Sequence, residues 1–325
     1  MTVLIAIQSA FEIWTIPDDY VERIRRQFPE HTFLHARTDE ETLAACGDAE
    51  VLFAGHITRA QLTAARRLRW VHSPAAGVGG MLFPEMLGSP VVITNSRGMS
   101  AGTIAEHVLA VTLALFRRLP HAFRSQAARE WAQDAIGREG NRLLAGSKVL
   151  VVGLGAIGSA VAHRMTALGA RVSGVRRRAT GDVHGEWTVA PAERLHDLLP
   201  DADVVVLSAP HTHETRQLIG RAELAAMAPD AILVNVSRGQ LVDEAALVDA
   251  LRSRQIAGAA LDVFVDEPLP PGSPFWTLPN VLITPHTSGF RPDHWDAATA
   301  LFAENLRRFA AGEPLLNVVD KEAGY

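Results

Sequence analysis

Short apolar runs alternate with amphipathic stretches along the whole chain. Such alternation predicts parallel strands joined by crossover helices, so the expected fold class is α/β. In the first hundred residues the apolar runs predict strands, and two amphipathic stretches predict helices. The strands are expected at Val3–Ile7, Thr32–His35, Val51–Gly55, Trp70–His72 and Val91–Thr94, and the helices at Asp18–Phe28 and Thr58–Arg67.

A long helix is predicted in the middle of the chain, from Ser100 to Arg118, because apolar residues recur there at spacings of three to four. A short helix is expected over His121–Asp134, and Gly137, Gly140 and Gly146 predict loops. From Lys148 the strand–helix alternation resumes. Strands are expected at Lys148–Val152, Arg171–Val175, Val204–Ser208, Ala231–Val236, Ala259–Val263 and Val281–Thr284, and helices at Ile157–Leu168, Glu223–Met227, Glu244–Ser253 and His294–Ala311.

The domain organisation follows from length and element order. A chain of 325 residues is long enough for two separate cores. The second sheet is complete before the final helix begins, so that helix is expected to pack on the first domain. The sequence therefore predicts two Rossmann-like or flavodoxin-like domains with parallel sheets. A discontinuous domain comprises 1–98 plus 292–325, and the other comprises 99–291.

Composition narrows the function classes. The chain is 48% apolar and 21% charged, which is typical of a globular protein. A net charge of −5 argues against nucleic acid or an anionic membrane as partner. The single cysteine, Cys46, excludes an intramolecular disulfide and a multi-cysteine zinc site, and no metal is expected. The apolar run at Val3–Ile7 is too short for a signal peptide or a membrane span, which favours a cytoplasmic location.

A glycine motif of the form G-x-G-x-x-G follows the strand Lys148–Val152 and precedes a predicted helix. In this context Gly153 permits a tight turn, Gly155 lets a pyrophosphate approach the backbone, and Gly158 lets helix and strand pack closely. The helix N-terminus then offers N–H groups to the phosphates. A turn with a purely structural role is the alternative. The expected cofactor contacts here are Gly153, Leu154, Gly155, Ala156, Ile157 and Gly158.

The end of the next strand bears on the choice of cofactor. Enzymes that use NAD usually carry an acid about 20 residues after the motif, where it binds the ribose 2′-hydroxyl. This chain has Arg176, Arg177 and Arg178 instead. Arginine forks bind a 2′-phosphate, so NADP(H) is the expected cofactor, with NAD(H) as an alternative. A solvated basic turn that binds nothing would look the same in sequence.

Three further motifs end three successive strands and carry an arginine, a carboxylate and a histidine: Arg238, Glu267 and His286. The carboxyl ends of parallel strands meet at one edge, so these side chains are expected beside the nicotinamide. Arg238 can grip a substrate carboxylate, and His286 can protonate a carbonyl oxygen as hydride arrives. Glu267 would orient the imidazole and favour its protonated form. Each residue taken alone also has an ordinary structural explanation.

Taken together, these motifs resemble the D-isomer-specific 2-hydroxyacid dehydrogenases over nearly the whole chain. The resemblance implies Arg238 as substrate anchor, His286 as acid/base and Glu267 as its partner. It also implies that backbone N–H groups at Ala76 and Gly77 hold the substrate carboxylate. Further cofactor contacts are expected at Ala209, Pro210, Val236, Ser237, Arg238, Asp262, His286 and Gly289.

The family resemblance carries implications for assembly and activity. It assigns the helix Ser100–Arg118 and the segment to Trp131 to a two-fold homodimer contact. Arg176 stands where many members have an acid, as in NADP-using glyoxylate/hydroxypyruvate reductases, and Gly77-Val78-Gly79 replaces the more usual Gly-x-Asp. Glu267 argues against formate oxidation. The expected activity is NADPH-dependent reduction of small 2-keto acids to D-2-hydroxy acids. The alternatives are an NAD(H)-linked D-2-hydroxyacid or phosphoglycerate-type dehydrogenase, and a non-catalytic dinucleotide sensor resembling the C-terminal-binding-protein corepressors.

Overall fold

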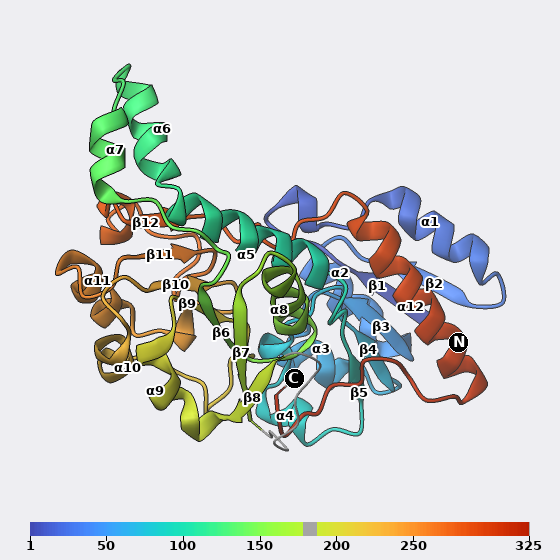
Figure 1. The fold of residues 1–325 in the computed structure, drawn as a ribbon. Coiled ribbons are helices and arrows are strands. Elements are labelled where there is room, and N and C mark those ends of the chain that lie inside the picture. Colours follow the sequence, from blue (N-terminus) through green and yellow to red (C-terminus); the bar gives the residue numbers. More distant parts are fainter. Residues whose placement is uncertain (178–186, 325) are drawn as a thin grey trace. The chain divides into compact units, whose positions relative to one another are not determined.

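The computed structural model describes residues 1–177 and 187–324, and the chain divides into two compact units. Unit 1 comprises Met1–Met99 and Arg291–Tyr325, and unit 2 comprises Ser100–Phe290 (Figure 1). Each unit contains one sheet in which all paired strands are parallel. The predicted α/β class with parallel sheets is therefore confirmed.

Unit 1 contains a five-stranded sheet in the order β2-β1-β3-β4-β5, which is the flavodoxin-like order. The predicted strands of this unit are all present, within one or two residues of their expected ends. The strands are β1 (Thr2–Ala6), β2 (Thr32–His35), β3 (Val51–Ala54), β4 (Trp70–His72) and β5 (Val92–Thr94). The helices are α1 (Asp18–Gln27), α2 (Asp39–Ala45), α3 (Arg59–Ala64), α4 (Pro84–Leu87) and α12 (His294–Ala311).

Helix α12 belongs to the core of unit 1. Its buried Phe302 stacks on Phe53 of β3 with ring centroids 4.2 Å apart, and on Trp70 of β4 at 5.5 Å. Aromatic stacking of this kind adds to the gain from apolar burial. The C-terminal part of the chain is thus tied to the first sheet by large side chains at its centre.

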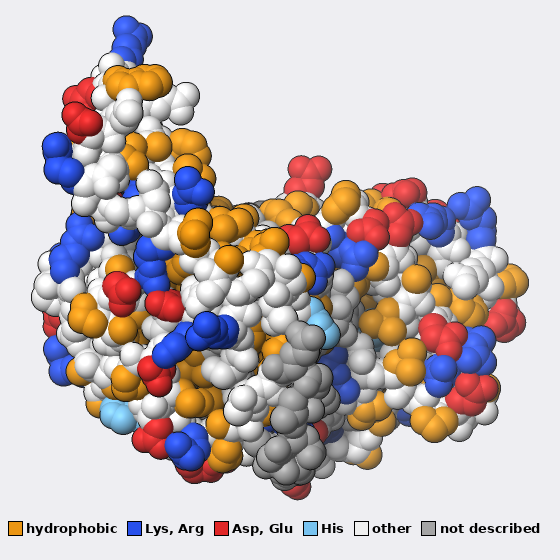
Figure 2. All heavy atoms as spheres, viewed as in Figure 1, with side chains coloured by type: hydrophobic (Ala, Val, Ile, Leu, Met, Phe, Trp, Pro, Cys, Tyr) orange, Lys and Arg blue, Asp and Glu red, His pale blue; other side chains and the backbone are white. Residues whose placement is uncertain are grey.

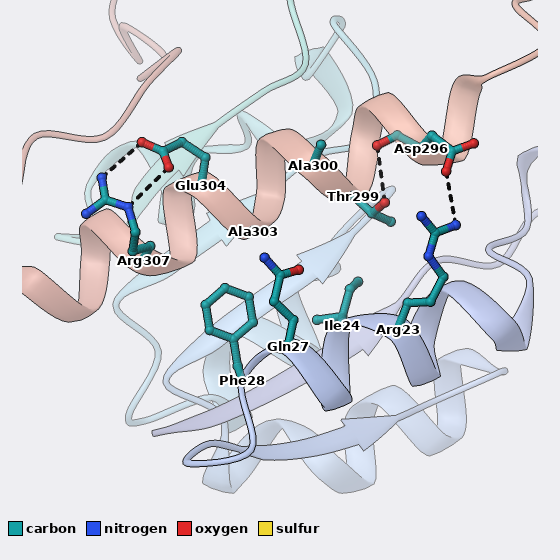
Figure 3. A pocket seen from close by; sticks show the side chains of 10 residues that line it. All are labelled: Arg23, Ile24, Gln27, Phe28, Asp296, Thr299, Ala300, Ala303, Glu304 and Arg307. Atoms are coloured by element: carbon teal, nitrogen blue, oxygen red, sulfur yellow. Dashed lines mark hydrogen bonds and ion pairs between the residues drawn. The ribbon is translucent and has the colours of Figure 1, made fainter.

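A groove of about 400 Å³ lies between α1 and α12 (Figure 3). Ile24 and Phe28 of α1 contribute apolar surface to it. At one end Arg23 lies 3.0 Å from Asp296, and at the other Arg307 lies 3.1 Å from Glu304. The charges at both ends of the groove are therefore paired within unit 1.

Unit 2 contains a seven-stranded sheet in the order β12-β11-β10-β9-β6-β7-β8. Its first strand, β6, lies between β7 and β9, so the strand order reverses at β6 as in a doubly wound dinucleotide fold. The strands are β6 (Lys148–Val152), β7 (Arg171–Arg176), β8 (Thr188–Pro191), β9 (Val204–Leu207), β10 (Ile232–Asn235), β11 (Gly258–Leu261) and β12 (Val281–Ile283). The helices are α5 (Ala101–Phe116), α6 (Leu119–Ala128), α7 (Gln133–Glu139), α8 (Ala156–Ala167), α9 (Leu195–Leu198), α10 (Arg221–Ala226) and α11 (Glu244–Arg252).

Two helices replace the single one predicted over His121–Asp134, and together they form a projection from unit 2 (Figure 1). Gly137, which predicted a loop, lies inside α7. The chain breaks between α6 and α7 because Arg129 adopts a left-handed conformation with φ +60°. No described helix combines the length and the hydropathy needed to cross a bilayer.

Candidate active site

The turn from β6 into α8 needs glycine at two positions. Gly153 has φ +98°, and a Cβ there would lie 2.5 Å from the backbone nitrogen of Ala209. A Cβ on Gly158 would lie 2.0 Å from the carbonyl oxygen of Gly153. No real side chain tolerates either distance, so both glycines are required by the packing of the turn.

Gly155 differs from these two, because a Cβ on it would meet nothing within 4 Å. Gly155 and Ala156 are exposed, and Gly155 is the N-cap of α8 with no side chain capping the helix. The first N–H groups of this helix of 12 residues are therefore open to an anion. A bare backbone beside a helix N-terminus fits the pyrophosphate of a dinucleotide, and this turn is where it would be held.

Neighbouring side chains fix the glycine turn. Ser208, just after β9, donates a hydrogen bond to the carbonyl oxygen of Gly153 over 2.7 Å. Leu154 packs against Gly174 of β7 so closely that a Cβ there would lie 2.1 Å from it. The motif predicts the glycines, whereas the sequence gives no signal for Ser208 because its role depends on the β6–β9 pairing.

The basic segment after β7 meets an acid from the segment after β9, on the other side of β6. Arg176 is the last residue of β7 and is half-buried. Arg177 lies 3.5 Å, Nη1 to Oε2, from Glu214 in the segment after β9. Both segments flank the glycine turn, since β7 and β9 are the two neighbours of β6. Arg178, the third arginine of the run, lies outside the described residues. The sequence analysis did not identify Glu214.

Arg238 is held at the carboxyl end of β10 by a tight loop. Asn235 accepts from the N–H of Ser237 at 3.1 Å and donates to the carbonyl oxygen of Arg238 at 2.9 Å. The hydroxyl of Ser237 donates to the carbonyl oxygen of Ala209. Burial lowers the pKa of the Arg238 guanidinium, and the charge of Glu267 opposes that effect. An arginine remains cationic after such a shift, so Arg238 offers a partly desolvated positive charge.

Gly239 brings the Arg238 loop against the loop that carries Glu267. A Cβ on Gly239 would lie 2.0 Å from the backbone carbon of Phe264. The backbones after β10 and β11 are therefore in direct contact. This approach explains why the charge of Arg238 acts on Glu267.

His286 and Glu267 form a hydrogen-bonded pair, with 2.7 Å between Nδ1 and Oε2. The other carboxylate oxygen of Glu267 accepts from the N–H of Phe264 at 2.9 Å. Burial raises the pKa of Glu267, but the hydrogen bonds from His286 and Phe264 and the charges of His286 and Arg238 outweigh it and leave the pKa below its ordinary value. An ionised carboxylate thus holds Nδ1, while Nε2 has no hydrogen-bond partner among the described residues.

Asp262 supports the loop that presents His286. Its buried carboxylate accepts from the Thr284 hydroxyl at 2.6 Å and from the N–H of Thr287 at 2.9 Å. Its second oxygen accepts from the N–H of Ser288 at 3.1 Å. His286 itself adopts φ +53° and donates its N–H to the carbonyl oxygen of Asp262 at 2.8 Å. A cofactor contact at Asp262 stays a prediction.

His107 of α5 joins this network, 3.2 Å from the Thr284 hydroxyl. Burial lowers its pKa, and the charge of Asp262 works in the opposite direction. The remaining expected cofactor positions of unit 2 also lie at strand ends. Ala209 and Val236 are buried just after β9 and β10, Pro210 is exposed, and Gly289 is half-buried after the His286 loop.

Ala76 and Gly77 lie in unit 1, in the exposed segment that follows β4. Asn95 donates to the carbonyl oxygen of Ala76 at 2.7 Å, and the N–H of Ser96 donates to Ala75 at 3.0 Å. Among the described residues, none accepts a hydrogen bond from the N–H of Ala76 or Gly77. The segment is therefore fixed through its carbonyl groups, while two N–H groups of exposed residues have no acceptor among the described residues.

Residues 109–288 match the family model described as D-isomer specific 2-hydroxyacid dehydrogenase, NAD binding domain. The chain is 36% identical over 265 residues to a glyoxylate reductase of Aeropyrum pernix, covering 80% of this chain and 79% of that protein. It is 33% identical over 287 residues to a D-3-phosphoglycerate dehydrogenase of Methanocaldococcus jannaschii, covering 87% of this chain but only 54% of that protein. The crystal structure of a D-isomer specific 2-hydroxyacid dehydrogenase from Xanthobacter autotrophicus Py2, in complex with NADPH and MES, superimposes with a TM-score of 0.86 at 31% identity over 99% of both chains. The chain thus belongs to the D-isomer-specific 2-hydroxyacid dehydrogenase family.

Proposed function

We propose that this protein reduces small 2-keto acids to D-2-hydroxy acids with NADPH. The observation that carries the proposal is the pairing of His286 with Glu267 beside a partly desolvated Arg238. Imidazole with a carboxylate partner suits proton transfer near neutral pH, and a guanidinium suits a carboxylate substrate. A glyoxylate reductase among the relatives supports this substrate class.

Each residue of the site then has one task. A bound nicotinamide dinucleotide supplies the hydride that reduces the keto carbon. His286 donates its Nε2 proton to the carbonyl oxygen, because Nδ1 is engaged by Glu267. Glu267 stabilises the imidazolium before transfer, and Arg238 orients the acid through its carboxylate. In this proposal unit 2 binds the dinucleotide, and the backbone N–H groups of Ala76 and Gly77 in unit 1 are donors suited to a carboxylate.

The preference for NADPH rests on Arg176 and Arg177 at the end of β7, where an NAD enzyme would carry an acid. The related structure from Xanthobacter autotrophicus contains NADPH, which supports this assignment. The test is steady-state turnover with glyoxylate and either NADPH or NADH. Wild type should show a lower KM for NADPH, and Arg176→Asp should lose that preference. A wild type that prefers NADH contradicts the cofactor proposal, and one that reduces no keto acid contradicts the activity.

We further propose a homodimer whose contact includes the α6–α7 projection. Several apolar residues of α5, such as Val108 and Phe116, are buried within unit 2, whereas Leu109 and Leu113 of the same helix are only partly buried. The projection does expose large apolar side chains: Trp131 is 91% exposed and Phe123 is 62% exposed. Figure 2 shows hydrophobic side chains on this projection and beside its base on α5. Light scattering at micromolar concentration should give twice the chain mass, and a monomer mass would reject the dimer.

A further inference from the structure

The loop after β11 that carries Glu267 has two neighbouring backbone N–H groups, and each of them is bound by a carboxylate. The N–H of Phe264 donates to Oε1 of Glu267 at 2.9 Å. The N–H of Val265 donates to Oε1 of a second acid, Glu244, at 2.8 Å. Glu244 is half-buried and is the first residue of α11. All four residues belong to unit 2, so a helix of the same unit supports the loop of Glu267.

Val265 is held through both of its backbone polar groups. Glu244 accepts from its N–H, and the side-chain amide of Gln240 donates to its carbonyl oxygen at 3.3 Å. The loop that follows Arg238 lies against the same backbone, since a Cβ on Gly239 would lie 2.2 Å from the nitrogen of Val265. The position of the Glu267 loop is therefore set by contacts from α11 and from the Arg238 loop.

Glu244 does not serve its own helix, although an acid in a first helical turn ordinarily interacts with the free N–H groups there. Asp243 is the N-cap of α11, and its side chain already accepts a backbone hydrogen bond from the helix. Glu244 instead binds a residue 21 positions later in the chain. Burial and the charges of Asp266 and Glu267 raise the pKa of Glu244, against the effect of the hydrogen bond from Val265. A carboxylate kept partly away from water and near other acids is typical of a functional site.

We infer that Glu244 is a positioning residue, which fixes Glu267 against His286 by binding the N–H of Val265. This inference rests on the proposed function, in which Glu267 stabilises the protonated imidazole. Without that bond the backbone at Val265 is released, and the adjoining N–H of Phe264 loses its fixed direction. Oε1 of Glu267 then loses its anchor, and Oε2 is no longer held 2.7 Å from Nδ1 of His286.

The test compares the reduction of glyoxylate by NADPH in wild type, Glu244→Ala and Glu244→Gln across the pH range. Ala leaves the N–H of Val265 without its partner. In that variant kcat should fall roughly tenfold, as a small misplacement near the chemistry can cause, and the alkaline decline of reduction should move to lower pH. The Kd for NADPH should be unchanged, and KM for glyoxylate should change less than kcat. Gln keeps an oxygen that accepts from Val265, so kcat should stay within about threefold of wild type.

Glu223 provides a matched control in the same unit. Its carboxylate, in α10, accepts from the N–H of Gly220 at 3.0 Å, which is a bond of the same kind. The folded fraction of Glu223→Ala should keep the kcat and the pH profile of wild type. A loss in Glu223→Ala as large as that in Glu244→Ala would overturn the inference, because any lost carboxylate–backbone bond would then have the same effect.

Glu267→Gln, measured in the same assay, separates this inference from the proposed function. If Glu267→Gln moves the alkaline decline but Glu244→Ala does not, Glu244 does not position the pair and the inference fails alone. Equal losses in Glu244→Ala and Glu244→Gln would also overturn it, since the charge and not the bond to Val265 would then matter. If Glu267→Gln leaves the decline in place, the proposed role of the pair fails, and the inference fails with it.

Discussion

In unit 1 the chain leaves β1 at Ala6 and enters α1 only at Asp18, whereas in unit 2 it leaves β6 at Val152 and enters α8 at Ala156. The connection in unit 1 contains a 3₁₀ turn at Glu12–Trp14 and no glycine. The connection in unit 2 is three residues long, and two of them are glycine. A short glycine turn puts a helix N-terminus directly at the sheet edge, whereas a long connection does not. The first connection of each sheet therefore differs, and the one in unit 2 has the form of a dinucleotide-binding turn.

Two histidines at strand ends show the same contrast. His72 ends β4 in unit 1, is fully buried, and has one ring nitrogen 2.6 Å from the Thr94 hydroxyl. Burial lowers the pKa of His72 to about 3, so it is neutral in the folded protein at physiological pH. His286 follows β12 in unit 2, is half-exposed, and is paired with a carboxylate. Both histidines lie at strand ends, but of the two only His286 is exposed and paired with a carboxylate.

The largest effect should come from a substitution of His286, compared with a substitution of His72. His286→Ala removes the general acid and should lower kcat for glyoxylate by roughly 10²- to 10⁴-fold, with little change in NADPH binding. His72→Gln is the matched control in unit 1, and its folded fraction should keep a kcat close to wild type. Stopped-flow and steady-state assays on protein of known folded fraction measure the kcat of the two variants. Equal losses of kcat in the two variants would show that His286 is no more catalytic than His72.

His72 should also make the stability of the protein depend on pH. Between its folded pKa of about 3 and its unfolded value of about 6.5, the unfolded chain binds a proton that the folded chain does not. The free energy of unfolding should therefore fall as the pH drops below 6.5, and the contribution of His72 between pH 7 and pH 5 is about 2 kcal/mol.

Urea unfolding of wild type and His72→Gln at pH 7 and pH 5 measures this contribution. The variant should lose less stability than wild type over the same interval, since its side chain does not titrate. The same pH dependence in both proteins would mean that folding does not lower the pKa of His72.

A smaller effect should distinguish two exposed glycines that have equal room around them. A Cβ on Gly155 or on Gly55 would meet nothing within 4 Å, so Ala is expected to fold at either site. Gly155→Ala places a methyl group where the pyrophosphate approaches, and the Kd for NADPH should rise about tenfold, or 1.4 kcal/mol. Gly55→Ala should leave that Kd unchanged. Fluorescence titration measures the Kd for NADPH in both variants. An unchanged Kd in Gly155→Ala would show that the dinucleotide does not bind at this turn.

The sequence predicted the strands of both units well where apolar runs were long and bounded by polar residues. It missed β8 (Thr188–Pro191), a short edge strand, and α2 (Asp39–Ala45), whose first turn is acidic and whose apolar face is small. It merged α6 and α7 because the break depends on the left-handed backbone of Arg129, a residue type with no turn preference. The local pattern of apolar and polar residues predicts the long elements. It does not predict backbone conformations that are imposed by packing.

The candidate site divides in the same way. The sequence predicts three candidate residues because each follows a strand and carries a distinct chemistry: Arg238, Glu267 and His286. The structure places Glu267 beside His286. The contacts that hold these residues in place could not be predicted from the sequence. The approach of Gly239 to Phe264 depends on how separate loops meet, and so do the hydrogen bonds that Asp262 accepts from the N–H groups of Thr287 and Ser288. Distances between loops arise from the tertiary fold, so they leave no periodic signal in the chain.

The pH dependence of reductive kcat/KM in wild type and Glu267→Gln tests the central claim, that Glu267 and His286 act as one unit. The pKa of Glu267 lies below its ordinary value of about 4.3, so the carboxylate stays ionised above pH 5 and its own titration should cause no loss of wild-type reduction above that pH. Gln keeps the shape of the side chain but removes the charge that stabilises the protonated imidazole. The alkaline decline of reduction should therefore move to lower pH in Glu267→Gln, with NADPH binding unchanged. Profiles with the same inflection in both enzymes would contradict the account, because the carboxylate 2.7 Å from His286 would then have no influence on its proton.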